Sequence, residues 1–454
     1  MAKYQKYAEY QDSGVEWLGD VPKHWLITTF KRVIKEHSGN GFPIELQGDE
    51  SGVIPFLKVS DINGANKYSD RCNNRISKEA LNKYGWNLVP KGSIVTGKIG
   101  EALRKNHRKI LSEDSVIDNN CIGIEPIHLT ENYNFYVHKV IDFDWYVNGG
   151  AIPSISVQKY KAEIIAIPNE NEQTQIANFL DHETAKIDKL IAKQEKLIEL
   201  LKEKRQAVIS HAVTKGLNPN VPMKDSGVEW LGEVPEHWDV CKIQYYAKIE
   251  SGHTPSKTNE RYWENCTIPW VSLNDSKQLR VVDYISDTKY KISELGLANS
   301  SARILPKDTV VFTRDASIGL SAITTKEMAV SQHLIAWLPK KERLSPEFLL
   351  LIFYAMEKEF NRYTFGSTIK TIGMDDVSSL MAAFPSLAEQ IDIVERCFSQ
   401  FLLIDKSIGK SLALLDVLKE KRTALISAAV TGKIDVRNWQ HPNQKNNKHT
   451  ELSA

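Results

Sequence analysis

Residues 12–25 read DSGVEWLGDVPKHW and residues 225–238 read DSGVEWLGEVPEHW, so that 12 of 14 positions are identical. A second matching pair is LKEKRQAVISHAVTK at 201–215 and LKEKRTALISAAVTG at 418–432, with 11 of 15 positions in common. The first pair is 213 residues apart and the second 217. The chain therefore contains one unit twice, and a duplication of this kind decides the architecture.

The interiors of the two repeats differ far more than their ends. Only short correspondences remain there, such as IPF at 54–56 with IPW at 268–270, and EQ at 172–173 with EQ at 389–390. Two copies of one scaffold that hold two different inserts are unusual for an enzyme with one active site. They suit a molecule that places two distinct binding units at a fixed spacing.

Each repeat is predicted to hold a globular domain followed by a long helix. Residues 26–168 and 239–385 combine short β-rich runs with Gly, Pro and Asn turns, which indicates α/β domains. Residues 172–212 and 389–429 lack proline, and their seam positions recur at alternating spacings of three and four, as in a coiled coil. The apolar seam residues are Ile187, Ile191, Ile198, Leu201 and Val208 in the first helix, and Ile404, Ile408, Leu415, Leu418 and Leu425 in the second.

The two seams match each other at an offset of 217, including the polar positions Gln194 with Ser411 and Arg205 with Arg422. Matched seams on one chain most simply pair with each other, antiparallel, and polar seam residues set the register. A helix of about 40 residues would be roughly 60 Å long and would hold the two domains apart. The alternative is that each helix packs as an ordinary amphipathic helix on its own domain.

These observations predict an α+β chain with a pseudo-two-fold internal repeat. Glycines at 216 and 432 are expected to end the helices. The expected layout is an N-terminal repeated segment at 1–25, a first recognition domain at 26–170, a coiled-coil helix at 171–217, the repeated linker motif at 218–238, a second recognition domain at 239–386, a second coiled-coil helix at 387–434 and a disordered tail at 435–454.

Composition limits the class of protein. A length of 454 residues predicts several domains, and 42% hydrophobic with 25% charged residues is typical of a globular protein. The N-terminus lacks the apolar core of a signal peptide and no apolar run reaches bilayer length, so a cytoplasmic location is expected. The net charge of +1 neither favours nor excludes DNA binding. The five cysteines form no CxxC pair and are expected to be buried free thiols.

A basic run between the repeat ends is a candidate DNA contact. Six basic residues and one acid lie between Lys91 and Lys109, and Lys98 corresponds to Arg314 in the second repeat. Lysine and arginine on a loop suit phosphates, and arginine also suits guanine; a solvated surface patch is the alternative. The candidate DNA-binding residues are Lys98, Arg104, Lys105 and Arg108 in the first repeat, and Thr254, Ser256, Lys257, Trp270, Asn274, Lys277 and Arg314 in the second.

Catalytic motifs are incomplete. GSIVTGK at 92–98 resembles a phosphate loop, but Ile99 stands where a Ser or Thr would bind magnesium. Asp275-Ser276-Lys277 resembles the end of a nuclease triplet without a second placed carboxylate. The histidines show no metal-ligand spacing, and the chain has neither an NPPY-type motif nor a glycine-rich methyl-donor loop. No catalytic residue and no metal site are therefore predicted.

The repeated SGVEWLGxVPxHW opening, SGHTPSK at 251–257 and the LKEKR helix ends strongly resemble the specificity subunit of Type I restriction–modification systems. The resemblance covers nearly the whole chain except the tail. It implies two target-recognition domains that read the halves of a split, asymmetric DNA site, and paired helices that act as a ruler. It also implies two methyltransferase subunits that use S-adenosylmethionine, and motor-endonuclease subunits that use ATP and Mg. Those cofactors would belong to the partners, and this chain would hold none.

Two other functions stay open at this point. One is a DNA-cutting or DNA-modifying enzyme with its catalysis in this chain, which activity of the isolated chain would reveal. The other is a coiled-coil adaptor that binds proteins only, which sequence-selective and salt-dependent DNA retention would exclude.

Overall fold

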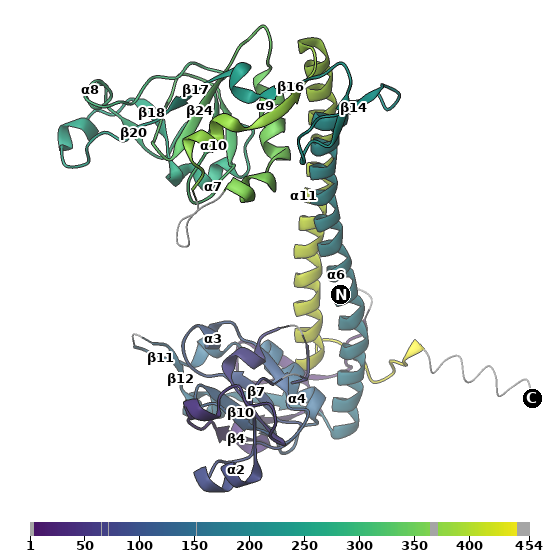
Figure 1. Ribbon diagram of the computed structural model, residues 1–454. Coiled ribbons are helices and arrows are strands. Elements are labelled where there is room, and N and C mark those ends of the chain that lie inside the picture. The colour runs from purple at the N-terminus through teal and green to yellow at the C-terminus, as the bar shows by residue number, and fades with distance from the viewer. Residues whose placement is uncertain (1–3, 65, 71, 151, 364–370, 443–454) are drawn as a thin grey trace, which may run out of the picture. The chain divides into compact units, whose positions relative to one another are not determined.

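The computed structural model describes residues 4–442 except 65, 71, 151 and 364–370. The chain forms two compact units, one of residues 1–194 with 413–454 and the other of residues 195–412. Each unit combines one globular domain with a part of each of two long helices, α6 (Glu170–Lys215) and α11 (Leu387–Val430) (Figure 1). The predicted α+β class and the long paired helices are confirmed.

In the first unit, the main sheet is antiparallel. Its order is β4 (Ile34–Ser38), β10 (Cys121–Pro126), β7 (Ile94–Gly97) and β8 (Arg108–Ile110). A smaller sheet has the order β6 (Arg75–Ile76), β5 (Ile54–Leu57) and β9 (Val116–Ile117), and β3 (Leu26–Thr29) pairs with β13 (Ile164–Ile167). Helix α4 (Glu131–Val140) has six buried residues, and four of them, Tyr133, Phe135, Tyr136 and Val137, belong to the hydrophobic core of this unit.

The second unit repeats this strand order and adds a fifth strand, β19 (Tyr284–Ile285), which pairs parallel with β22 (Ser321–Thr324). Its main sheet has the order β17 (Ala247–Ser251), β24 (Leu334–Pro339), β21 (Val310–Thr313), β22 and β19. Its smaller sheet is β20 (Lys291–Ile292), β18 (Ile268–Val271) and β23 (Ala329–Val330), and β16 (Asp239–Lys242) pairs with β25 (Met381–Phe384). The register is also repeated, since Cys121 lies opposite Gly97 and Leu334 opposite Thr313.

Short elements complete both units. A hairpin begins just before each repeated opening motif and ends within it: β1 (Tyr10–Asp12) with β2 (Asp20–Pro22), and β14 (Met223–Asp225) with β15 (Glu233–Pro235). The remaining helices and strands are α1 (Phe30–Val33), α2 (Lys78–Tyr84), α3 (Gly100–Arg104), β11 (Val147–Asn148), β12 (Ser154–Ile155), α5 (Val157–Ala162), α7 (Ser276–Leu279), α8 (Glu294–Ala298), α9 (Pro346–Ala355) and α10 (Met374–Ser379).

The facing sides of α6 and α11 carry the residues expected at the seam. All ten of those residues are buried or half-buried, whereas Leu190 and Leu414, which lie between seam positions, are exposed. In the first unit Ile187 packs in one cluster with Leu418 and Leu425. Burial at alternating spacings of three and four is the packing of a coiled coil.

Both long helices end at a glycine in the left-handed conformation. Gly216 has φ of 72° and Gly432 has φ of 70°. A Cβ at Gly216 would lie 3.1 Å from the ring of Trp238, and one at Gly432 would lie 2.2 Å from Pro22. Glycine is therefore required at Gly432 for both backbone conformation and space, as the helix-end pattern predicts.

The tail differs from the expected disorder as far as residue 442. Val436 is buried, and the ring of Trp439 meets Phe179 of α6 edge-on at 5.7 Å. This part is ordered because an aromatic side chain in a polar stretch finds an apolar partner that lies far away in sequence. Residues 443–454 of the expected tail lie outside the described residues.

The five cysteines are free thiols. Cys121 and Cys397 are buried, whereas Cys72, Cys241 and Cys266 are only half-buried, which differs from the expectation that all five lie in the core.

Candidate functional site

Each repeated opening motif is bound to the start of a long helix through one glutamate. In the first unit the Glu172 carboxylate accepts hydrogen bonds from Trp25 Nε1 at 3.0 Å and the Tyr7 hydroxyl at 2.7 Å. In the second unit Glu389 accepts from Trp238 Nε1 at 3.1 Å. These contacts explain why the motif and the helix start are both repeated, because each supplies the partner of the other.

The next residue joins the same helix start to the globular domain. Gln173 donates to the carbonyls of His128 at 3.2 Å and Pro168 at 3.0 Å, and accepts from the Thr130 amide at 2.8 Å. Gln390 makes the equivalent three bonds, including one at 2.9 Å from the amide of Ser345. A single buried amide thus ties together the helix start, the sheet and the helix that follows the central strand.

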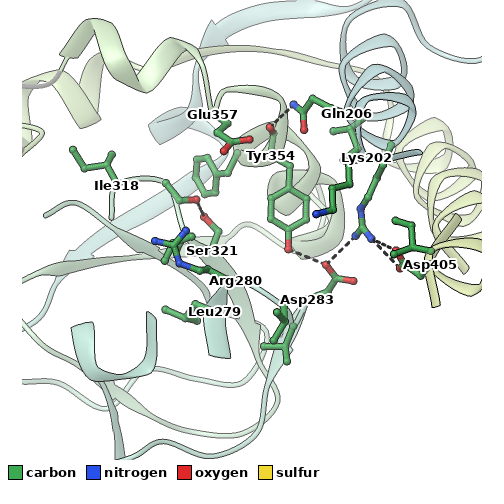
Figure 2. A pocket seen from close by; sticks show the side chains of 18 residues that line it. Lys202, Gln206, Leu279, Arg280, Asp283, Ile318, Ser321, Tyr354, Glu357 and Asp405 are labelled. Atoms are coloured by element: carbon green, nitrogen blue, oxygen red, sulfur yellow. Dashed lines mark hydrogen bonds and ion pairs between the residues drawn. The ribbon is translucent and has the colours of Figure 1, made fainter. Parts of the chain in front are cut away.

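A cavity of about 620 Å³ lies where the second domain meets α6 and α11, within the second unit (Figure 2). Arg205 of α6 holds both oxygens of Asp405, at 3.0 and 2.9 Å, and lies 3.8 Å from Asp283 of the domain. The Tyr354 hydroxyl donates to Asp283 at 2.8 Å, and Gln206 donates to the Tyr354 carbonyl at 2.8 Å. Burial, and then the Asp283 carboxylate, raise the pKa of Tyr354, so this hydroxyl stays a donor. The network fixes the domain on the helices.

The first unit has the same arginine–aspartate pair between its helices, but different charged residues on its globular domain. Arg422 of α11 donates to both oxygens of Asp188, at 2.7 and 3.1 Å. Lys67 lies 2.5 Å from Asp181. Burial, and then Arg108 and Arg422, lower the pKa of Lys139 to about 8. The arginine–aspartate pair between the helices therefore recurs in both repeats, whereas the charged residues of the globular domains near it differ.

The candidate DNA contacts of the first unit are divided between surface and core. Arg104 and Lys105 are exposed at and just after the end of α3, and Lys98 is half-exposed after β7. Lys98 donates its backbone N–H to Asn120 at 2.9 Å. These three residues are accessible to a ligand.

Arg108 differs from the expectation of a surface contact. It is 3% exposed, donates to the Ile141 carbonyl at 2.7 Å, and lies 4.6 Å from the Phe143 ring centre. Burial lowers its pKa to about 10. Its guanidinium is enclosed in the domain core, so Arg108 is not accessible to DNA, which corrects its place among the candidate contacts.

In the second unit, the 254–257 loop is accessible but internally bonded. The Ser256 hydroxyl lies 2.9 Å from that of Thr258, the Thr254 hydroxyl bonds to Gln332, and Lys257 is exposed. Trp270 is 5% exposed and donates from Nε1 to the His253 carbonyl at 3.1 Å. Trp270 therefore supports the loop from below and is not itself a surface contact.

The nuclease-like stretch is a turn. Asp275 is 2% exposed, and its oxygens accept from the amides of Ser272 at 2.8 Å and Lys289 at 2.7 Å. Its neighbours Asn274 and Lys277 are exposed. The carboxylate is committed to main-chain donors, so its role is structural. Among the described residues, no group of three or more His, Cys, Asp and Glu could hold a metal ion.

Arg314 stands beside polar residues that the sequence did not single out. It is half-buried after β21, and its backbone N–H donates to the His333 carbonyl at 3.0 Å. His333 lies 2.6 Å from Asp315, which also accepts from the Thr371 hydroxyl at 2.8 Å. The only signal in the sequence is the polar pair Gln332-His333 before an apolar strand, which is too weak to predict a site.

The fold and these sites define a protein with two different binding domains held by repeated contacts on one helical scaffold. Residues 22–200 and 235–409 match the family model of the Type I restriction modification DNA specificity domain, and the chain belongs to this family. It is a DNA specificity subunit of a Type I restriction–modification system, a non-catalytic component of that enzyme.

Individual relatives are similar to this chain over most of its length. The Type I restriction enzyme MjaVIII specificity subunit of Methanocaldococcus jannaschii is 23% identical, over 92% of this chain and 95% of the relative. The EcoBI specificity subunit of Escherichia coli is 21% identical, over 96% and 91%. The HsdS subunit from Thermoanaerobacter tengcongensis shares the fold, with a TM-score of 0.52, 13% identity and coverage of 91% and 98%. A chain of a type I R-M system studied for its assembly gives 0.67, at 12% identity and coverage of 90% and 98%.

Within the described residues, no helix combines the length and the apolar character needed to cross a bilayer.

Proposed function

We propose that the two globular domains each read one half of a bipartite, asymmetric DNA site, and that the paired helices set the length of the unread spacer. The observation that carries this proposal is a contrast. The contacts between domain and helix recur in both units through Glu172 and Glu389 and through Gln173 and Gln390, whereas the exposed polar residues of the domains differ. A repeated helical scaffold that holds two domains with different surfaces suits the recognition of two different half-sites.

The accessible candidates fall into two roles. Lys98, Arg104, Lys105, Lys257 and Lys277 would contact phosphates, which fixes the position of a protein on the duplex without reading sequence. Arg314 and Asn274 would contact base edges, since arginine pairs with guanine and asparagine with adenine in the major groove.

Membership of the family supports a proposal for the partners. Two methyltransferase subunits would dock on the helical regions and methylate adenine with S-adenosylmethionine, and motor-endonuclease subunits would use ATP and Mg. The complex would work in the cytoplasm, where the host DNA lies. Catalysis and cofactors would reside in those subunits, and this chain would supply the recognition of the DNA sequence.

The test of the ruler is a binding series on duplexes whose spacer is lengthened or shortened. One base pair rotates a half-site by about a tenth of a turn, so a stiff spacer element should lose affinity with each step. Equal affinity at every spacing would contradict the ruler. Exchange of residues 26–168 for another reader should change one half of the target only, and a change in both halves would contradict the modular reading.

A further inference from the structure

One end of the main sheet in the second unit carries a network of polar side chains, which we call the 332–333 network. Asp315 receives the Thr371 hydroxyl on one oxygen, at 2.8 Å, and lies 2.6 Å from His333 Nδ1 through the other. The Nε2 atoms of His333 and Gln332 are 3.4 Å apart, and the Thr254 hydroxyl donates to the Gln332 carbonyl oxygen. The segments that carry Thr254, Asp315 and Thr371 are thereby joined around the side chains of Gln332 and His333.

The network leaves its two central side chains open to a ligand. Gln332 is exposed and the His333 side chain is 43% exposed, whereas that of Asp315 is only 16% exposed. The Asp315 carboxylate fixes the ring through Nδ1, so Nε2 faces the Gln332 amide at 3.4 Å, a long contact that a base edge can replace. Asp315 thus orients His333 from beneath.

Two backbone contacts at this place recur in the first unit. Lys98 donates its amide to the Asn120 carbonyl at 2.9 Å, as Arg314 does to that of His333 at 3.0 Å. Ile99 pairs with Ser154 in an isolated bridge, as Asp315 pairs with Thr371. Asn119 and Asn120 therefore occupy the positions of Gln332 and His333, and both are exposed.

The side chains at these equivalent positions have different hydrogen-bonding capacity. The first unit presents two short amides beside a lysine, and the second presents a longer amide and an oriented imidazole beside an arginine. Gly39 and Gly252 secure the close approach of a neighbouring loop in both units, because a Cβ would lie 1.8 Å from the Asp118 carbonyl oxygen and 2.1 Å from that of Val330. Equivalent backbone contacts with unlike polar side chains are the pattern expected where two domains distinguish different bases.

The location fits this role. Asn119 and Asn120 precede β10, and Gln332 and His333 precede β24. The opposite end of each strand leads to a helix whose start is bound by Gln173 in the first unit and by Gln390 in the second. Six residues of strand separate the two ends by about 20 Å. One end is fixed to the scaffold and the other, with its cationic neighbour, is open.

We propose that Gln332 and His333, and at the equivalent place Asn119 and Asn120, read base edges of the two DNA half-sites, with Asp315 as the positioning residue of His333. This inference rests on the proposed function, since it names the readers within each domain. Asparagine and glutamine pair bidentately with adenine in the major groove, and each such pair discriminates strongly against other bases.

The experiment selects bound duplexes from a library randomised across both half-sites, using the complex of the full chain with its methyltransferase subunits. The variants are Gln332→Asn with His333→Asn, the reciprocal Asn119→Gln with Asn120→His, and Asp315→Asn. The control is Lys341→Asn with Glu342→Asn, two exposed residues beyond the opposite end of β24. The unfolding midpoint of each complex is measured in parallel.

The expected result is a change of about tenfold or more in base preference at one or two adjacent positions of a single half-site. The 332–333 and 119–120 variants should affect opposite halves, Asp315→Asn should weaken preference at the same positions as the 332–333 variant, and the control should select the wild-type sequence. Unchanged preference in folded variants, or a change in both halves, would overturn the inference. If one pair variant fails to fold, the reciprocal variant decides. Failure of the proposed function looks different, because the wild-type complex would then select no bipartite site.

Discussion

Arg422 of α11 donates to both carboxylate oxygens of Asp188 on α6, from Nε at 2.7 Å and from a terminal nitrogen at 3.1 Å. The equivalent residues 217 positions away form the same pair with the helices exchanged, since Arg205 of α6 holds Asp405 of α11. Equivalent helices that run antiparallel produce this exchange, because each position on one helix faces the counterpart of its own partner. The repeat in the sequence is thus also a repeat of interhelical contacts, within each unit.

Reversal of the Arg422–Asp188 pair tests whether it helps to set the register. The side chains are 32% and 48% exposed, so Asp188→Asn should lower the free energy of unfolding by only about 0.5–1 kcal/mol. Asp188→Arg alone should cost more through repulsion, and addition of Arg422→Asp should restore most of the loss. Urea unfolding measures each step of this cycle. The exposed pair Lys196–Glu199, within one helix, is the matched control, and equal effects at both sites would contradict the interhelical role.

Glu172→Ala should destabilise the first unit more than Glu389→Ala destabilises the second. The Glu172 carboxylate is 3% exposed and serves Tyr7, Trp25 and His24, whereas the Glu389 side chain is 29% exposed. Loss of Glu172 leaves two buried donors unpaired, at a cost of about 2–4 kcal/mol, and loss of Glu389 should cost about half as much. Thermal unfolding of the two variants checks this order, and Glu172→Gln should retain part of the stability. Equal losses would show that burial does not govern these anchors.

The helices could be predicted well and the domains only coarsely. The predicted segments 172–212 and 389–429 lie within α6 and α11, because the period of the seam and its repetition are local signals. The strands pair across long separations, as Phe56 does with Val116, and two-residue strands leave little pattern. The basic run predicts a surface position for Arg108, whereas its burial depends on partners more than 30 residues away. His333 was missed for the same reason, since Asp315 meets it only in the folded sheet.

Gly252→Ala should impair recognition of one half-site while the rest of the chain stays folded. A Cβ would lie 2.1 Å from the Val330 carbonyl oxygen and 2.4 Å from that of Ser331, so the loop must move and lose the bond from the His253 amide. Such crowding costs about 1–3 kcal/mol locally. Competition between duplexes altered in one half-site measures the effect. Gly41→Ala is the control, because no atom lies within 4 Å of its added Cβ, and equal defects in the two variants would refute the steric explanation.

Lys139 makes the free energy of unfolding of the first unit depend on pH in the alkaline range. Burial, and then Arg108 and Arg422, lower its pKa to about 8, whereas an unfolded lysine titrates near 10.4. Between these values the unfolded chain binds more protons than the folded one, so stability rises with pH across this window and the penalty is complete below pH 8. Lys139→Met should therefore stabilise the protein at pH 7, by on the order of 2 kcal/mol, and flatten the rise between pH 8 and 10.

The control for this prediction is Lys67→Met in the same unit. Burial also lowers the pKa of Lys67, but its ammonium lies 2.5 Å from Asp181, which opposes the shift. Because Asp181 already offsets part of the cost of burying Lys67, Lys67→Met should stabilise the protein at pH 7 less than Lys139→Met does. Chemical denaturation at several pH values from 7 to 10.5 gives both slopes. A rise in stability with pH that persists unchanged in Lys139→Met would assign the dependence to another group, and the explanation by burial of Lys139 would fail.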